Sequence, residues 1–410
     1  MVQINPERLI SDLRTLRTFG TYKTGVHRPT FSDIDMQSRR WLIDRMTDAG
    51  LTATIDGVGN VIGRSPVAGP KLLMGSHIET QPYGGWLDGA MGVIFAVEMA
   101  RAVAEDPALA GRGVDAAAWA DEEGHYFPFL GSRSFIDDVS EDDIDSARNK
   151  FDGTALRDAL GQAGLADLPR ARWEADRYLG YLEAHIEQGP TLDTMNQKIG
   201  VVTSIIGSWQ YEVISEGTQN HAGTTAMALR RDAGRALIKL AYAIDQHFPK
   251  IAGERSVWTV GDLRLEPGAP AIVPGRARML FQFRDADPAQ LARFGAAFDE
   301  LVADVAADDP CTITATHLSA STPSLMDQDF QDALSEAAEA WVPGLHQRMP
   351  SGAGHDAQIL AKVMPAGMMF IPSIGGVSHH WSEDTDEADI VTGAQVLATA
   401  IGNILSRAAS

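Results

Sequence analysis

The chain has 410 residues, enough for two or three domains, and its apolar content of 44% and charged content of 22% are those of an ordinary folded protein. A net charge of −21 argues against nucleic acid or an anionic membrane surface as a partner, because no basic stripe is present to release counterions. One cysteine, an N-terminus without a basic and then apolar segment, and no apolar run of the ~18 residues that a membrane span needs predict a cytoplasmic protein without intramolecular disulfides.

Apolar segments in the first part of the chain alternate between helical and strand patterns. A helix is predicted over residues 6–19, and Ser32 is expected to cap a second helix that extends to about Ala49. A third helix is predicted over residues 90–103. The predicted strands are residues 51–55, 60–63, 71–75 and 114–120. This alternation predicts an α/β fold with a mostly parallel sheet covered on both faces, which binds ligands at the carboxyl ends of its strands.

The pattern changes at Gly207, where alternating residues predict antiparallel strands packed with two helices in an α+β sandwich. The predicted strands are residues 210–215, 256–265, 277–284 and 311–317, and the helices are residues 231–248 and 287–307. We expect this domain, residues 207–322, to be inserted into a first domain made of residues 1–206 and 323–410. An acidic helical segment, a strand and a final helix complete the first domain, at residues 137–177, 367–372 and 390–405.

Polar residues of the types that bind metal ions follow several of the apolar strands or lie on glycine-rich turns. They are His77, Asp88, Glu122, Glu123, His185 and His379. Each has an ordinary structural explanation when taken alone, since Asp-Gly sequences form turns and a histidine after a strand is often structural. Together they would face one edge of a sheet, where their donor atoms suit two divalent ions bridged by Asp88, roughly 3.5–4 Å apart.

Such a pair of ions predicts a hydrolase. Two metals lower the pKa of a shared water toward ~7 and so provide hydroxide at neutral pH. A carboxylate beside that water can take its proton and pass it to a leaving nitrogen. Glu122 and Glu123 can divide metal binding and proton transfer between them, and the residues alone do not show which does which.

Nine segments between about residues 25 and 383 carry a resemblance to a known family. They are Gly75–Thr80, Leu87–Gly92, Asp121–Gly124, Leu130–Arg133, His185–Pro190, Asn220–Thr225, Arg230–Asp232, Ser351–Gln358 and Gly375–His379. In this order they resemble the N-carbamoyl-L-amino-acid amidohydrolases and allantoate amidohydrolases, a branch of the dinuclear-metal aminoacylase and carboxypeptidase superfamily. The resemblance implies a homodimer formed through the inserted domain, which also closes over the site as a lid.

The resemblance also implies a ligand set for each metal. His77, Asp88 and His185 would hold one ion, and Asp88, Glu123 and His379 would hold the other. Zn, Mn, Co and Ni suit these histidine and carboxylate ligands about equally. The resemblance therefore implies two divalent metal ions as cofactors.

Further residues match the catalytic and substrate-binding positions of the family. Glu122 would be the general base, and His221, from its own or the partner subunit, would stabilise the oxyanion. Arg284 would grip a substrate carboxylate, a task that suits its planar fork. The positions that would line the pocket are Gln188, Gly354 and His355.

Four places depart from the family pattern. Glu79 stands where an aspartate orients the first histidine ligand, and we expect its longer side chain still to reach that ligand. Ala271 stands where an asparagine binds substrate, and Ala226 replaces a proline. His380 and Trp381 replace a small residue and a proline after His379; His380 could compete as a ligand, although the spacing favours His379.

These departures bear on the substrate. Loss of the asparagine, together with the aromatic residues Trp86, His125, Tyr126 and Trp381 near the site loops, predicts an N-carbamoyl or N-acyl amino acid with an aromatic or unusual side chain. Allantoate hydrolysis and an aminoacylase or dipeptidase activity are the alternatives on the same scaffold. A non-catalytic protein that captures a small amide is a third, against which stands the complete set of Glu122 and its candidate metal ligands.

Overall fold

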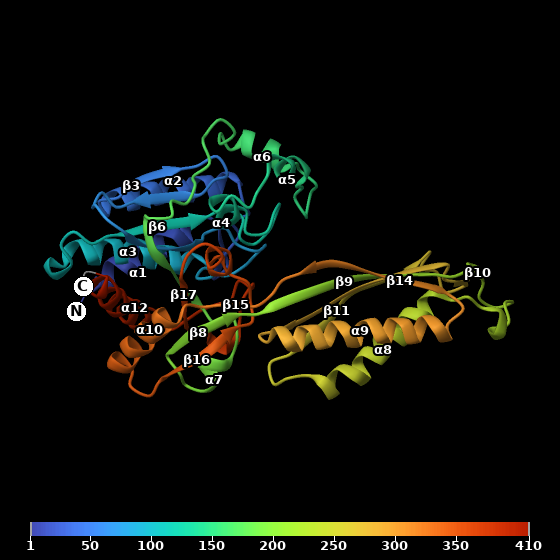
Figure 1. Ribbon diagram of the computed structural model, residues 1–410. Helices are drawn as coiled ribbons and strands as arrows, with labels where there is room; N and C mark the ends of the chain where they lie inside the picture. The colour runs from blue at the N-terminus through green and yellow to red at the C-terminus, as the bar shows by residue number, and fades with distance from the viewer. Residues whose placement is uncertain (1, 409–410) are drawn as a thin grey trace. The chain divides into compact units, whose positions relative to one another are not determined.

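A computed structural model describes residues 2–408. The chain divides into two compact units, one made of residues 1–203 and 325–410 and the other of residues 204–324 (Figure 1). The insertion predicted over residues 207–322 thus begins at Ser204 and ends at Ser324. Each unit has a hydrophobic core of its own and is described separately.

The first unit is built on a nine-stranded sheet in the order β15-β8-β17-β7-β5-β6-β4-β3, with β16 paired to β8. The four central strands, β17, β7, β5 and β6, run parallel, whereas β8, β4 and β3 pair antiparallel to their neighbours. The strands are β3 (Thr52–Ile55), β4 (Val61–Arg64), β5 (Lys71–His77), β6 (Val114–Trp119), β7 (Tyr178–Ile186), β8 (Ile199–Ile205), β15 (Ser324–Leu325), β16 (His346–Ser351) and β17 (Ala366–Ile371). The predicted parallel sheet is the centre of this larger one, and β5 to β7 are almost wholly buried, as strands covered on both faces must be.

Helices cover both faces of this sheet. They are α1 (Pro6–Thr18), α2 (Asp33–Asp48), α3 (Ala90–Glu105), α4 (Leu130–Phe135), α5 (Glu141–Ser146), α6 (Leu156–Gln162), α7 (Thr191–Thr194), α10 (Gln328–Trp341), α11 (Asp356–Leu360) and α12 (Glu387–Arg407). Side chains of α1, α3, α10 and α12 form one large core with alternate residues of β7, Leu182 and Ala184. Glu183 points to the opposite face, where its carboxylate accepts the Ala357 amide of α11. The side chain of Ser32 caps α2, as the sequence predicts.

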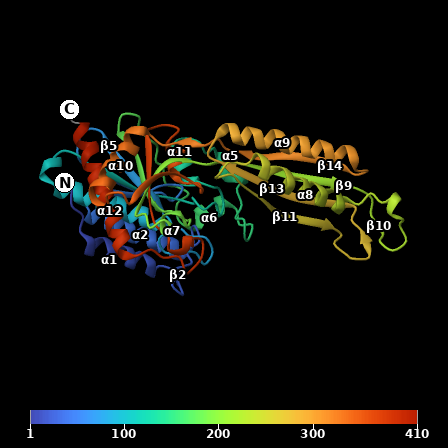
Figure 2. The same ribbon diagram turned by 90° about the horizontal axis from the view of Figure 1, so that it is seen from below.

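Helix α12 illustrates how apolar this core is. Among the residues that the structure describes, it is the one helix long and apolar enough to cross a membrane by length and composition. It packs against α10 (Figure 2) and against β17, however. Of its apolar window, 72% is buried. In this structure α12 is a core helix.

The second unit is a four-stranded antiparallel sheet, in the order β11-β13-β9-β14, with two long helices packed on one face. Its elements are β9 (Gly207–Glu216), β10 (Asn220–His221), α8 (Ala233–Ile251), β11 (Val257–Glu266), β12 (Ile272–Val273), β13 (Arg276–Asp285), α9 (Pro288–Asp308) and β14 (Thr312–Ala320). Alternate residues of β13, including Met279 and Phe281, are buried against α8 and α9. The short strands β10 and β12 form a separate two-stranded sheet.

Several elements differ from the sequence-based expectation. Strands β8 and β16 and helix α10 belong to the first unit and were not predicted. The segment predicted to be helical over residues 137–177 forms only the short helices α5 and α6. Strand β7, which is central and carries His185, was not predicted either. The central strands β5 and β6, which end near the other polar residues, are predicted ones.

Candidate metal centre

The polar residues gather where the parallel strands of the first unit end. His77 is the last residue of β5, His185 is the penultimate residue of β7, and the pair 122–123 follows β6. Asp88 lies in the turn before α3, and His379 lies in the loop after β17. Strands β7, β5 and β6 are neighbours in the sheet, so their carboxyl ends bring these side chains to one edge.

Two groups of possible metal ligands share Asp88. One group adds His77 and His185, and the other adds Glu123 and His379, with all the ligand atoms of a group within 4.8 Å of one another. Oδ1 of Asp88 lies 3.6 Å from Nε2 of His77 and 3.0 Å from Nε2 of His185. Its Oδ2 lies 3.3 Å from Nε2 of His379. One oxygen faces each group, as in a carboxylate that bridges two metal ions, and these imidazole and carboxylate donors fit Zn, Mn, Co or Ni.

The backbone orients the two buried histidines toward this centre. Nδ1 of His77 lies 3.0 Å from the carbonyl oxygen of Glu79, and Nδ1 of His185 lies 2.9 Å from that of Ile186. An N–H at Nδ1 donated to a carbonyl leaves Nε2 as the ligand atom. The turn before α3 approaches so closely that a Cβ on Gly89, whose φ is +64°, would lie 2.4 Å from the His77 ring. Only glycine fits there.

The structure distinguishes the two adjacent glutamates. Oε2 of Glu123 lies 3.7 Å from Nε2 of His379 and accepts a 2.8 Å hydrogen bond from the side-chain amide of Gln81. Glu122 belongs to neither ligand group among the described residues, but its Oε2 lies 3.6 Å from Nε2 of His77. Its side chain is 9% exposed. Glu123 therefore belongs to a group that could hold a metal ion, and Glu122 lies beside that group.

Charges inside the centre shift its pKa values strongly. Burial raises the pKa of Glu122 well above its usual value, and the charges of Glu123 and Asp88 act in the same direction. Burial would also raise the pKa of Asp88, but its contacts with the three histidines hold that pKa well below the usual range. The bond to Asp88 raises the pKa of His379 to about 9. Without metal ions, the centre thus holds protons on histidines that must be neutral to act as ligands.

Metal binding should therefore release protons. At pH 7 the metal-free protein carries a proton on His379. It also carries one on His77: burial alone would lower the pKa of this histidine, but Glu122 and the other carboxylates raise it well above its usual value. Each proton must leave before the nitrogen can bind metal, so metal affinity should rise with pH up to about 9. Calorimetric titration of chelator-treated protein in two buffers of different ionisation enthalpy measures this release. An observed enthalpy that is the same in both buffers would contradict the prediction.

Of the three residues expected to line the pocket, two lie beside the metal ligands. The Nε2 group of Gln188 donates to Oδ2 of Asp88 at 3.1 Å. His355 is buried, and its ring packs edge-on against the ring of His185 at 4.6 Å. It therefore lies behind a ligand, where a close-packed ring fixes the ligand's orientation, while Gly354 before it is exposed.

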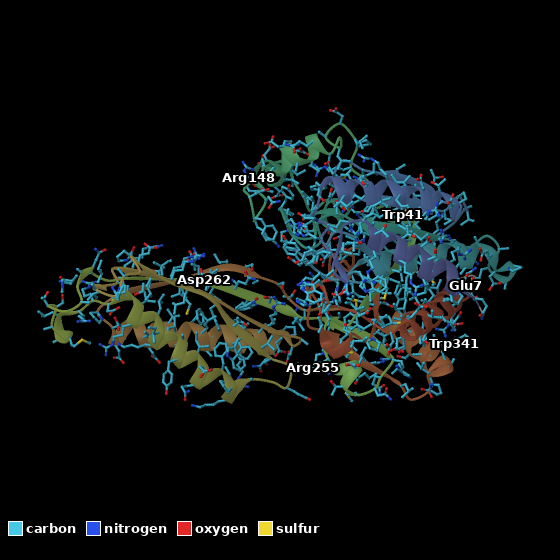
Figure 3. The ribbon with its side chains drawn as sticks, turned by 180° about the vertical axis from the view of Figure 1, so that it is seen from behind. Glu7, Trp41, Arg148, Arg255, Asp262 and Trp341 are labelled. Carbon is cyan, nitrogen blue, oxygen red and sulfur yellow. The ribbon has the colours of Figure 1, made fainter. Side chains whose placement is uncertain are left out.

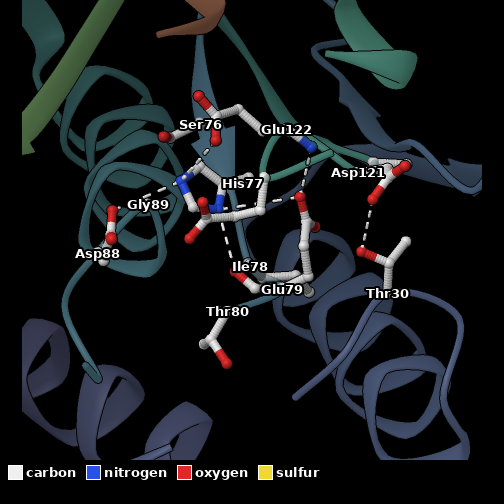
Figure 4. A network of polar contacts seen from close by, with 12 residues as sticks. Thr30, Ser76, His77, Ile78, Glu79, Thr80, Asp88, Gly89, Asp121 and Glu122 are labelled. Carbon is white, nitrogen blue, oxygen red and sulfur yellow. Dashed lines mark hydrogen bonds and ion pairs between the residues drawn. The ribbon is translucent and has the colours of Figure 1, made fainter. Parts of the chain in front are cut away.

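Glu79 does not occupy the role expected for it. Its carboxylate Oε1 lies 3.9 Å from Nδ1 of His77, which instead faces the backbone oxygen of Glu79. One carboxylate oxygen accepts a hydrogen bond from Arg39 at 2.8 Å. The other accepts the backbone amide of Glu122 at 2.6 Å (Figure 4). The side chain of Glu79 thus extends beyond His77 and is hydrogen-bonded to Arg39 and to the Glu122 backbone.

Three of the four aromatic residues expected near the substrate have structural partners. The indole N–H of Trp86 donates to Asp384, and the side chain is buried. His125 is buried too, and its Nδ1 accepts the amide of Thr30 at 3.2 Å. The ring of Tyr126 packs against a small apolar cluster that is separate from the main core. The half-buried ring of Trp381 lies in the loop that carries His379, with Nζ of Lys23 4.1 Å from the ring centroid.

The neighbouring His380 is not part of the centre. It is exposed, and its Nδ1 lies 2.7 Å from the hydroxyl of Ser382. His379 belongs to the ligand group instead, as the spacing in the sequence favours.

One supporting residue was missed by the sequence analysis. Oε1 of buried Glu383 accepts the backbone amides of Leu87 at 3.3 Å and Asp88 at 3.0 Å, and thus holds the turn that carries the shared ligand. A Cβ at Gly85 would lie 1.8 Å from this oxygen. No local pattern marks Glu383, because its partners lie far away in the chain.

The remaining candidates lie in the second unit. His221 is exposed in β10, and its Nδ1 accepts the backbone amides of Gly223 at 3.0 Å and Thr224 at 3.1 Å. Ala271 lies beside this turn, since its carbonyl accepts the Ala222 amide at 2.9 Å. Arg284, near the end of β13, is half-buried.

A parallel sheet that ends in two ligand groups sharing one aspartate, with a further buried carboxylate beside them, is the arrangement of a dinuclear-metal hydrolase. Residues 73–403 match peptidase family M20/M25/M40, and the chain belongs to this family, whose enzymes use divalent metal ions. The chain is thus a hydrolase of carbon–nitrogen bonds.

Its relatives bear out the resemblance seen in the sequence. N-carbamoyl-L-amino-acid amidohydrolase of Paenarthrobacter aurescens is 33% identical over 398 residues, which cover 95% of this chain and 96% of that protein. Allantoate amidohydrolase of Escherichia coli (strain K12) is 33% identical over 396 residues, covering 93% and 94%. The crystal structure of an amidase of the hydantoinase/carbamoylase family from Burkholderia phymatum superposes with a TM-score of 0.91, at 47% identity and with 99% of each chain covered.

Proposed function

We propose that the protein is a metal-dependent amidohydrolase that cleaves a linear amide or ureido bond of an N-carbamoyl or N-acyl amino acid. The observation that carries the proposal is the division of labour around Asp88: two ligand groups share it, and Glu122 lies beside them without belonging to either. Relatives with this type of activity span nearly the whole chain.

In this proposal the first ion is held by His77, Asp88 and His185, and the second by Asp88, Glu123 and His379. Bound divalent ions polarise a carbonyl oxygen and acidify water. Glu122 accepts a proton from the water that adds to the carbonyl carbon and delivers it to the nitrogen as the C–N bond breaks. Its raised pKa suits both the uptake of the proton from water and its release to the nitrogen.

Two residues of the second unit complete the proposal. With Nδ1 of His221 accepting two amide hydrogens, the proton of the neutral ring resides on Nε2. His221 therefore presents an N–H donor to solvent, which is the group needed to stabilise an oxyanion, in its own or in the partner subunit. Arg284 is proposed to bind the substrate carboxylate, because its planar fork matches that group.

We also propose that the protein is a homodimer formed through the second unit. Exposed apolar side chains lie on α8, at Ile238 and Tyr242, and along the edge strand β11, at Val257 and Leu263. Strand β11 is the edge of its sheet, so one side of its backbone is not paired within that sheet. It also carries charged side chains such as Asp262 (Figure 3), and a second copy would cover the exposed apolar ones. Sedimentation velocity should show a dimer that Tyr242→Glu weakens. A monomeric wild-type protein would overturn this proposal.

The substrate side chain is proposed to be aromatic or otherwise large. Half-buried Trp381 follows the ligand His379, and the half-exposed ring of Tyr83 stacks on His27 at 4.5 Å in the same unit. Lys23 lies 4.1 Å over the Trp381 ring. Aromatic surface at the loops of the centre favours a ligand that can pack against it.

The test is a substrate panel with metal-loaded protein. N-carbamoyl-L-phenylalanine and N-carbamoyl-L-tryptophan should be hydrolysed with a higher kcat/KM than N-carbamoylglycine, allantoate or dipeptides, and Trp381→Ala should reduce that preference. Faster ammonia release from allantoate would establish the alternative activity. Turnover of N-acetyl amino acids or dipeptides alone would indicate an aminoacylase or dipeptidase, and binding without turnover a non-catalytic protein.

A further inference from the structure

A buried ion cluster connects helix α2 to the loop that carries Glu122. The side chain of Arg39 is fully buried between two carboxylates, with Nε 3.0 Å from Oδ2 of Asp35 and Nη2 2.8 Å from Oε2 of Glu79. Its Nη1 donates to the carbonyl oxygen of Gly59 at 2.9 Å. All three nitrogens of the guanidinium are thus held, and this fixes the carboxylate of Glu79 in one orientation.

The second oxygen of that carboxylate is directed at the proposed general base. Oε1 of Glu79 accepts the backbone N–H of Glu122 at 2.6 Å, a short hydrogen bond to a charged acceptor (Figure 4). Nδ1 of His77 is 3.9 Å away from the same oxygen and has its own partner in a backbone carbonyl. The carboxylate therefore hydrogen-bonds the peptide of Glu122, whereas His77 lies only within ion-pair distance of it.

The loop needs such a contact because the side chains of Glu122 and Glu123 must point in different directions. Glu122 faces the neighbourhood of His77, whereas Glu123 faces His379, and the orientation of the peptide between Asp121 and Glu122 determines both directions. Asp121 has a φ of +56° and uses its own carboxylate to hold amides further along, including those of His125 and Phe127. The amide of Glu122 is left to Glu79.

We propose that Glu79, held by Arg39 and Asp35, is a positioning residue that sets the direction of Glu122 for proton transfer, rather than a support of the metal ligand His77. The inference rests on the proposed function, because it assigns Glu122 the role of base. It gives a physical reason for a glutamate at this position: the side chain must extend past His77 to reach the Glu122 amide and Arg39 together.

The test is Glu79→Gln, with Arg39→Lys as a second variant. Arg39 and the Glu122 amide donate to different oxygens of Glu79, and the glutamine replaces one of these oxygens by an NH₂ donor, so one of the two hydrogen bonds is lost. A lysine keeps the charge but cannot hold Asp35, Glu79 and Gly59 at once. Both variants should lower kcat about ten- to a hundredfold with KM changed less than about threefold, since a misplaced base slows the chemical step without weakening substrate binding.

Metal affinity provides the readout that is independent of turnover. Titration of the metal-free variants with Zn²⁺ should give two ions per chain, with affinities within about threefold of the wild type. Glu383→Gln is the matched control, because it makes the same change in a buried carboxylate that holds Asp88, and it should lower metal affinity about ten- to a hundredfold. Thermal unfolding checks that each variant is folded.

Two outcomes would overturn the inference. If Glu79→Gln lowers metal affinity as Glu383→Gln does, Glu79 supports the metal ligand after all. If both Glu79→Gln and Arg39→Lys retain the wild-type kcat, the cluster has no role in positioning. Both outcomes are distinct from failure of the proposed function, in which Glu122→Gln itself would leave turnover unchanged.

Discussion

Replacing Glu122 with glutamine should reduce kcat by about 10²- to 10⁴-fold, the range typical for loss of a general base. The amide is nearly isosteric with the carboxylate but cannot take a proton from water. Glu122 belongs to neither ligand group, so the variant should still bind two metal ions. Steady-state kinetics with an N-carbamoyl amino acid and metal analysis of the same preparation measure the two effects together.

The adjacent residue provides the control. Glu123 belongs to the ligand group of Asp88 and His379, so Glu123→Gln should weaken one metal site and leave the other occupied. The two variants make the same chemical change one residue apart and should separate turnover from metal content. If Glu122→Gln kept its turnover, or if it lost a metal ion while Glu123→Gln did not, the roles assigned here would be reversed or wrong.

Much of the fold follows from local sequence pattern. The central strands β5 and β6 and the helix α3 between them are apolar enough to be placed from their residues alone, as is the insertion with its alternating strands. Helix α10 escapes detection because its buried face relies on small residues such as Ala333 and Ala337, which weaken the helical pattern. Strand β8 merges into β9 without a turn of its own, so the sequence shows one apolar stretch where the structure has two strands.

The candidate site, like the fold, is predictable where it depends on local sequence and not where it depends on long-range contacts. The ligand types and their places at strand ends are visible in the sequence, since His77 ends an apolar run and Asp88 lies on a glycine-rich turn. In our proposal the direction of Glu122 is set by a contact with Glu79, whose own partner Arg39 lies on a helix elsewhere in the chain. Residues alone do not reveal such long-range contacts. Glu79 was expected to orient His77 because the resemblance places an aspartate with that role at this position.

Replacing Asp88 with asparagine should have the largest effect on the metal centre. Each carboxylate oxygen faces one ligand group, so a single change alters both sites, whereas replacing any other ligand alters one. The amide lacks the negative charge that makes a carboxylate a strong ligand for divalent ions. Its NH₂ group cannot act as a ligand, so the group of residues that it faces loses one ligand. We expect fewer than one tightly bound ion per chain and a loss of activity of at least about 10³-fold.

His379→Ala is the comparison that makes this result informative. It removes a ligand from one group only, so one ion should remain tightly bound at His77, Asp88 and His185. The side chain of His379 is half-exposed, so its removal should disturb the fold little. Metal titration of the two variants, followed by mass spectrometry under native conditions, gives the number of ions directly. Two ions bound to Asp88→Asn with wild-type affinity would show that Asp88 bridges nothing, and the two groups would then have to be independent sites. If His379→Ala lost both ions, the second site would instead be needed to form the first.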